Sequence, residues 1–461
     1  MIERKDELNE KLLELCDEYR SHNGFNSEDF LTYGVKRGLR NPDGTGVMAG
    51  LTNICNVHGF VMADGERVPD EGKLTYRGID VNDIVNACVE EDRFGFEETA
   101  WLLLFGSLPT KKMLDGFKMT LGSCRELPDN FTEDMILKNP SRDIMNKLSR
   151  SVLSLYSYDD NPDDTSLPNI MKQSIKLIAC LPTIMTYAYQ VKRRAFDRES
   201  MFFHPVDNSL STGESILRAL RPDTKFTDSE AKLLDLCMIL HAEHGGGNNS
   251  TFTARVLSSS GTDTYSAISA AIGALKGPRH GGANLRVRKM MTELKESVKD
   301  WKDEEEVYNY LAGIIRKEKG DGLGLIYGFG HAIYTLSDPR AVILKATAEK
   351  LAGEKQMLEE FDLYRTIEKL TPRVMSEVKG SSKVICANVD FYSGFVYDML
   401  GIPSELFTPL FAVSRIAGWC AHRIEEVTYG GRIIRPAYRS MVHNKKYTPI
   451  SQRGGSAVSG Q

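Results

Sequence analysis

Apolar residues recur along most of the chain at steps of three and four positions, which places them on one face of an α-helix. The pattern is clear in residues 97–109, EETAWLLLFGSLP, and in residues 229–244, SEAKLLDLCMILHAEH. Polar residues fill the intervening positions, as they do on the solvent face of an amphipathic helix. The pattern predicts an all-α fold.

One segment departs from the helical spacing. Around residues 51–80 the sequence GLTNICNVHGFVMADGERVPDEGKLTYRG mixes turn residues with short runs that suit β-strands. We expect a minor β-ribbon there, at the periphery of a helical protein.

Two helices near the middle of the chain have recognisable ends. The first is expected to begin at Thr227, where TDSE has the capping-box spacing, and to stop at the glycine run 245–247. His241 and His244 then fall in its last turn. The second is expected over residues 264–276, and its four alanines permit close packing against a helix of this chain or of a second subunit.

Length and composition indicate a globular protein with one large domain and a smaller companion, or with two domains. The chain has 461 residues, of which 41% are apolar and 26% charged. A net charge of -5 and a pI near 6.1 argue against nucleic-acid binding, but are compatible with a local basic pocket for a small anion. No apolar run approaches the roughly 18 residues of a membrane span, and the acidic, charged start does not resemble a targeting peptide. We expect a cytoplasmic enzyme.

The eight cysteines show no CxxC pair and no zinc-type spacing with histidine, so we expect reduced core residues. The only metal-like motif is the HAEH of residues 241–244, and no third ligand is identifiable. The sequence therefore predicts neither a metal site nor a bound cofactor.

Three segments are unusually polar for their surroundings and contain acid-base groups in or beside turns. They are GPRHGGAN around His280, GFGH ending at His331, and NVDFYSG around Asp390. An aspartate base and two imidazole donors are suitable for moving a proton next to a carbonyl whose oxygen gains negative charge. Each residue taken alone also fits a structural role in a turn or core.

Three arginines lie among apolar neighbours, where a guanidinium requires a partner. They are Arg340 in DPR, Arg415 in FAVSRIAGW and Arg435 in GRIIRPAY. Guanidinium groups bind carboxylates bidentately, so three of them in one pocket would suit a dicarboxylate. The alternative for each is an internal salt bridge.

Taken together and in order, these segments resemble the citrate synthase family. The similar segments are LHAEHGGGNNSTFTARV, GALKGPRHGGAN, GFGHAIYTLSDPRA and NVDFYSGFVYDMLGIP, with FEETAWLLLFGSLPT and KLTYRGIDV earlier in the chain. The resemblance implies an almost wholly helical homodimer. It also implies a large domain formed by residues 1–281 and 402–461, and a mobile small domain, residues 282–401, that closes over substrate.

The resemblance also implies roles for individual residues. His280 matches the donor to the acetyl-CoA thioester oxygen, Asp390 the base that removes the methyl proton, and His331 the group that polarises the oxaloacetate ketone. The residues that match the oxaloacetate-binding groups, the last of them contributed across the dimer interface, are His244, Arg340, Arg415 and Arg435.

The loop departs from the common family pattern for coenzyme A contacts, because many relatives have a basic residue where this chain has Ala332 or Thr335. The candidates for CoA binding are Gly328, Gly330, Asn388 and Lys383.

The resemblance predicts an acyltransferase that condenses acetyl-CoA with oxaloacetate and water to give citrate and CoA, the first step of the tricarboxylic acid cycle. A close alternative is 2-methylcitrate synthase, which uses propionyl-CoA. One extra methylene is discriminated by only about 1 to 3 kcal/mol in a pocket, so a few contacts decide between the two substrates. A third alternative, an inactive dicarboxylate-sensing paralogue, is disfavoured because all three catalytic residues are present.

Overall fold

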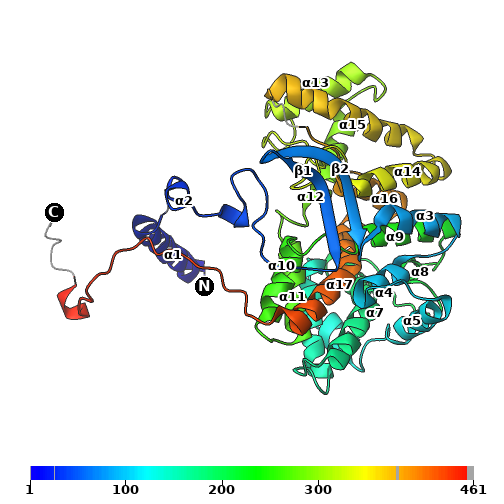
Figure 1. The fold of residues 1–461 in the computed structure, drawn as a ribbon, viewed down its shortest axis with the longest axis horizontal. Helices are drawn as coiled ribbons and strands as arrows, with labels where there is room; N and C mark the ends of the chain where they lie inside the picture. Colours follow the sequence, from blue (N-terminus) through cyan, green and yellow to red (C-terminus); the bar gives the residue numbers. More distant parts are fainter. Residues whose placement is uncertain (1, 25, 381–383, 454–461) are drawn as a thin grey trace.

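The computed structural model describes residues 2–24, 26–380 and 384–453, and it is mostly helical with one small antiparallel sheet (Figure 1). The predicted all-α class with a minor β-ribbon is therefore confirmed. The helices of the first half are α1 (Ile2–His22), α2 (Asp29–Thr32), α3 (Val81–Glu90), α4 (Phe96–Phe105), α5 (Lys111–Ser123), α6 (Ile144–Ser154), α7 (Leu167–Lys192) and α8 (Thr212–Leu220). Those that follow are α9 (Asp228–His241), α10 (Asn249–Ser259), α11 (Thr264–Lys276), α12 (Ala283–Ser297), α13 (Glu304–Ile315), α14 (Pro339–Glu354), α15 (Leu358–Lys379), α16 (Val389–Met399) and α17 (Phe407–Glu425).

The ribbon consists of β1 (Cys55–Ala63) and β2 (Glu66–Tyr76), with the short strand β3 (Ile79–Asp80) added to β2. Asp64 and Gly65 connect β1 and β2, and both have positive φ, as a tight hairpin turn requires. The expected peripheral position describes only part of the ribbon, since residues 61–66 are exposed while Leu74 and Tyr76 are buried. The ribbon packs on the segment 332–337, where Thr335 Oγ1 donates to the carbonyl of Gly59 over 3.1 Å.

Helix α9 begins as predicted, because the Thr227 side chain accepts from the Glu230 backbone and the Glu230 side chain accepts in return. Its end differs from the prediction: the last helical residue is His241, and His244 lies beyond the helix. The reason is a tertiary contact that the local sequence does not reveal. The hydroxyl of Tyr76 donates to the carbonyls of Ile239 and Glu243, at 3.0 and 3.1 Å, and so binds acceptors at the end of the helix.

Helix α11 spans the predicted residues 264–276. It packs against α6 and α10 of the same chain, so its small residues serve an intrachain contact.

The interior is organised around α17, which contacts α4, α7, α9, α10 and α11. Arg415, Trp419 and His422 are all fully buried on this helix. In contrast, α12 to α16 pack largely on one another, with α13 against α15 and α16 against α12 and α14. Figure 1 shows these helices at one end of the body and α4, α5, α7, α10 and α11 at the other. The division at residues 282 and 401 remains a prediction.

Helix α1 and the C-terminal segment extend away from the helical body in Figure 1. Cys16 on α1 is exposed, which contradicts the expectation that every cysteine lies in the core, while Cys88, Cys180, Cys237 and Cys420 are buried. Among the described residues, every helix is too short or too polar to cross a membrane.

Candidate active site

His331 is held in one tautomer by its own loop. Its Nδ1 accepts the backbone N–H groups of Ile333 and Tyr334, at 3.1 and 3.2 Å. The ring proton must then reside on Nε2, which is left to donate elsewhere. Burial and the nearby Arg340 lower the pKa of His331 to about 4, so the imidazole is neutral at physiological pH.

His244 faces His331 edge-on, with 5.0 Å between the ring centroids. Its Nε2 is buried and has no hydrogen-bond partner among the described residues. Burial, followed by the charges of Arg340, His331, Arg415 and His280, holds its pKa well below the ordinary value. The ring of Tyr334 joins these residues in one cluster: its centroid lies 5.5 Å from that of His244, 4.7 Å from that of His331 and 5.6 Å from the Arg340 guanidinium carbon.

Arg340 forms a bidentate ion pair with Asp338, with Nε–Oδ1 and Nη2–Oδ2 distances of 3.0 and 2.7 Å. Burial acts to lower the pKa of Arg340, but the adjacent Asp338 carboxylate outweighs it and raises that pKa. The internal salt bridge considered from the sequence is thus present at this position. Asp338 also accepts the Val389 N–H over 3.2 Å, which ties the loop to the start of α16.

Arg415 differs from Arg340 in its surroundings. It is fully buried, its Nε donates to the carbonyl of His241 over 2.6 Å, and its two terminal nitrogens have no partner among the described residues. Burial lowers the pKa of Arg415, and Glu243 opposes that shift. Buried guanidinium nitrogens are normally hydrogen-bonded, so this geometry is suited to receiving an anionic group.

Asp390 lies in the first turn of α16, whose N-cap residue Asn388 accepts the Asp390 N–H over 3.0 Å. Desolvation raises the pKa of Asp390 to about 6, against the opposing charges of Arg340 and Arg415. A carboxylate with a pKa near neutrality is suited to general base catalysis.

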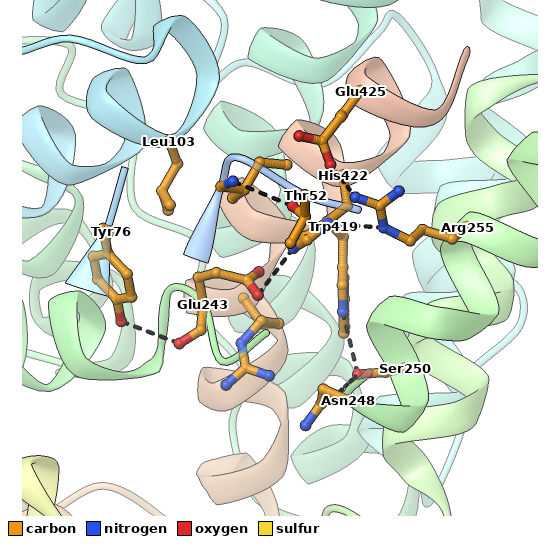
Figure 2. Close-up of polar contacts among 12 residues, drawn as sticks. Thr52, Tyr76, Leu103, Glu243, Asn248, Ser250, Arg255, Trp419, His422 and Glu425 are labelled. Carbon is orange, nitrogen blue, oxygen red and sulfur yellow. Dashed lines mark hydrogen bonds and ion pairs between the residues drawn. The ribbon is translucent and has the colours of Figure 1, made fainter. Parts of the chain in front are cut away.

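His280 follows α11 in a turn, and its Nε2 lies 3.0 Å from Oγ of Ser250 and 3.4 Å from the Ser250 backbone nitrogen. The Ser250 backbone N–H can only donate, so Nε2 is the acceptor in that bond and the ring proton resides on Nδ1, while the Ser250 hydroxyl also has Asn248 Oδ1 as an acceptor at 2.9 Å. Trp419 Nε1 donates to Ser250 Oγ over 3.2 Å, as Figure 2 shows. Burial and then the charge of Arg415 lower the pKa of His280 to about 4.

A buried network that joins Arg255, His422 and Glu243 was not found from the sequence (Figure 2). Arg255 Nε donates to His422 Nδ1 over 3.0 Å, so His422 carries its proton on Nε2 and donates it to Glu243 Oε1, also at 3.0 Å. Arg255 also pairs with Glu425 and Glu426, and Glu425 accepts the N–H of Asn53 over 2.8 Å. Burial acts to raise the pKa of Glu243, but His422 outweighs it and lowers that pKa, so Glu243 is an anion near Arg415.

These partners carry no sequence signal of their own. Ser250 and Glu243 lie inside the segments compared with the family, but their roles depend on Trp419 and His422, about 170 positions further along, as the separations of 169 and 179 residues show.

The predicted CoA residues meet where the loop around Gly328 pairs with the chain before α16. Gly328 and Gly330 have φ values of +84° and +83°, which favour glycine. The Asn388 N–H donates to the carbonyl of Gly328 over 2.8 Å, and the Asn388 side chain donates to that of Gly330 over 3.0 Å. Lys383 lies outside the described residues.

Arg435 is the one described oxaloacetate candidate that does not join the cluster. It is exposed on the segment after α17, and its neighbour Ile434 bonds through its N–H to Ser259 of α10 over 3.0 Å. Its expected role across a dimer interface stays a prediction.

No three His, Cys, Asp or Glu side chains of residues 10–24, 26–380 and 384–453 are grouped so as to hold a metal ion.

Comparison with known proteins identifies a matching family model and similar sequences. The family model described as the citrate synthase C-terminal domain matches residues 41–437. A citrate synthase of Haloferax volcanii is 33% identical over 389 residues, which cover 83% of this chain and 94% of that relative. A 2-methylcitrate synthase of Shewanella oneidensis is 35% identical over 386 residues, covering 82% and 92%.

Solved structures agree in fold. The citrate synthase of Thermoplasma acidophilum, in a ternary complex with carboxymethyl coenzyme A and oxaloacetate, has a TM-score of 0.72 to this chain at 28% sequence identity. The match covers 91% of this chain and 99% of that one. The citrate synthase of Thermotoga maritima has a TM-score of 0.70 at 29% identity, with coverages of 91% and 99%.

Proposed function

Because this chain belongs to the citrate synthase family, we propose that it condenses acetyl-CoA with oxaloacetate and water to form citrate and CoA. The observation that carries this proposal is the cluster itself. It combines a carboxylate whose pKa is raised to about 6 with neutral imidazoles and a buried arginine whose terminal nitrogens lack partners.

Oxaloacetate is proposed to bind at Arg415, with Arg340 and His244 beside it. The terminal nitrogens of Arg415 offer two parallel donors to one carboxylate. The Nε2 atoms of His331 and His244 are left to donate to the ketone and carboxylate oxygens. Arg435 of a second subunit would complete the dicarboxylate site in the proposed homodimer.

In the chemical step, Asp390 removes a proton from the methyl group of acetyl-CoA, while Nδ1–H of His280 donates to the thioester oxygen as it becomes an enolate. The enolate carbon attacks the ketone carbon of oxaloacetate, whose oxygen is polarised by Nε2–H of His331. Water then cleaves the thioester to release citrate and CoA. Neutral donors stabilise the developing charge without carrying a charge beforehand.

Coenzyme A is proposed to bind along Gly328, Gly330 and Asn388, within a mobile small domain of residues 282–401 that closes over the substrates. No cofactor or metal is required in this scheme, since both reactants are substrates. The proposal includes a cytoplasmic location and the first step of the tricarboxylic acid cycle.

The second candidate is 2-methylcitrate synthase, which uses propionyl-CoA with the same catalytic set. Relatives of both names match this chain at 33% to 35% identity, which favours neither. A dicarboxylate sensor without turnover is disfavoured because all three proposed catalytic residues, His280, His331 and Asp390, are present, and binding alone requires no base.

Thiol release from acetyl-CoA and from propionyl-CoA, each with saturating oxaloacetate, tests the proposal. A higher kcat/KM for acetyl-CoA supports citrate formation, and a higher value for propionyl-CoA supports the alternative. Oxaloacetate binding without thiol release from either thioester would support the sensor.

A further inference from the structure

The β-ribbon contacts the loop that aims His331, and one side chain makes the central contact. Arg67 on β2 donates through Nη2 to the carbonyl of Ile333 over 2.8 Å and reaches that of Ala332 at 3.4 Å. The two segments are 266 positions apart. The guanidinium lies over the ring of Phe60 on β1, 4.0 Å from its centroid, which fixes its plane.

Arg67 is not engaged in a salt bridge that would explain its place. None of the ion pairs among the described residues includes Arg67, its buried Nε has no hydrogen-bond partner, and its charge is only a minor influence on the pKa of Asp43. The hydrogen bonds that the side chain makes are both to the loop. A hydrogen bond from a charged donor to a carbonyl is stronger than one from a neutral donor, so the bonds from Arg67 hold the loop in place effectively.

The ribbon backbone fits the same loop along its length. A Cβ added at Gly59 would lie 2.8 Å from the Ile333 carbonyl oxygen, and one added at Gly72 would lie 2.1 Å from that of Ser337. The Gly72 N–H also donates to the Ser337 hydroxyl over 3.1 Å. Glycines at these two positions permit a backbone approach that a side chain would prevent.

The clamped residues are those that orient the imidazole. Nδ1 of His331 accepts from the N–H groups of Ile333 and Tyr334, and Arg67 holds the carbonyl of the same Ile333. Movement of this turn would change both the direction of Nε2–H and the bonds that fix the tautomer.

We propose that Arg67 is a positioning residue that, with the β-ribbon, aims the Nε2–H of His331 at the ketone of the substrate. This inference rests on the proposed function, in which His331 polarises oxaloacetate. It assigns no substrate contact to Arg67 itself.

The experiment compares Arg67→Ala, Arg67→Lys and the control Lys73→Ala, which removes a positive charge from an exposed position on the same strand. The readouts are kcat, oxaloacetate affinity, melting temperature and the infrared stretch of bound oxaloacetate labelled with carbon-13 at the ketone. In the native enzyme this stretch is expected at lower frequency than in free oxaloacetate, because His331 donates to the oxygen.

Arg67→Ala is expected to reduce kcat about 10- to 100-fold and to shrink the ketone shift, since small misplacements of catalytic groups have effects of this size. Oxaloacetate affinity is expected to change much less. Arg67→Lys should recover part of both losses, because the charge and one donor remain, and Lys73→Ala should match the native enzyme.

Two results would overturn the inference while leaving the proposed function intact. One is native kcat with a full ketone shift in Arg67→Ala. The other is a lowered melting temperature and affinity with a full ketone shift, in Arg67→Ala or, if that variant does not fold, in Arg67→Lys. Absence of the shift in the native enzyme would instead overturn the role of His331 and the inference with it.

Discussion

Trp419 and Ser250 are 169 positions apart, yet the indole Nε1 of Trp419 donates a 3.2 Å hydrogen bond to Ser250 Oγ, which in turn lies 3.0 Å from Nε2 of His280. The contacts at Nε2 therefore orient the imidazole of His280. Its free Nδ1–H is therefore directed by a residue on α17, the same helix that carries Arg415.

Ser250→Ala is expected to lower kcat about 10- to 100-fold, because His280 loses the hydroxyl that orients it. Oxaloacetate affinity should stay near the native value, since the Ser250 hydroxyl bonds to His280, Asn248 and Trp419 and to neither Arg340 nor Arg415. Steady-state kinetics and calorimetric titration with oxaloacetate measure the two quantities. Unchanged kcat would show that the backbone N–H of Ser250 suffices to orient the ring.

Asp390→Asn is expected to fold normally. Its condensation rate should be lower by about 10²- to 10⁴-fold or more, because an amide cannot accept the methyl proton. Thiol release measures the rate and circular dichroism the fold. Near-native turnover in the folded variant would remove Asp390 from the mechanism.

The pH dependence follows from the pKa of Asp390, which is raised to about 6. Only the ionised carboxylate accepts a proton, so kcat/KM for acetyl-CoA should rise with pH through about 6 and level off above it. His280 and His331, each with a pKa of about 4, stay neutral over that range. A profile that falls as pH rises through about 6 would contradict this assignment.

Arg415→Leu is expected to weaken oxaloacetate binding about 30-fold or more, since losing one partner of a buried charge pair costs about 2 to 5 kcal/mol. The melting temperature should change little, because Arg415 has no ion-pair partner among the described residues and its removal relieves an unfavourable burial. Calorimetry and thermal melts provide the comparison. Native affinity with a collapsed fold would indicate a structural arginine.

Acetyl-CoA is expected to bind more tightly when oxaloacetate is already present. The proposed substrate ligands lie on both sides of the predicted boundary, Arg340 and His331 within residues 282–401 and His244 and Arg415 outside it. A dicarboxylate that contacts both sets favours the closed state. Titrating an unreactive acetyl-CoA analogue with and without oxaloacetate measures this coupling, and equal affinities would exclude it.

Local signals in the sequence predicted much of the fold. The capping box at Thr227 is a short-range arrangement of two side chains, and it placed the start of α9 correctly. The end of that helix depends on the hydroxyl of Tyr76, which comes from a distant strand, so the glycine run alone placed the end too late. The ribbon was also predicted from a local signal, its turn residues and short strand-like runs. Its position in the fold was not predicted, because this position depends on contacts with residues 332–337.

The same distinction applies to the site. Glycine-flanked histidines and an aspartate after an apolar run are visible in the sequence. In the structure Arg415 acts on the pKa of His280, Arg340 on that of His331, and both arginines on that of Asp390. The residues that orient these groups are not marked by any local sequence pattern. Trp419 in a buried helix and Arg67 in an edge ribbon acquire their roles only from the partners that folding brings to them.

The hydrogen bond from Asn53 to Glu425 spans 372 positions, and it connects the chain before β1 with the end of α17. During synthesis on the ribosome, Asn53 is therefore made long before Glu425. The segment before β1 has no partner for most of that time. Bringing such distant segments together is slow relative to helix formation. Refolding from denaturant should accordingly restore the helical signal first and catalytic activity later, when the two ends of the chain have met.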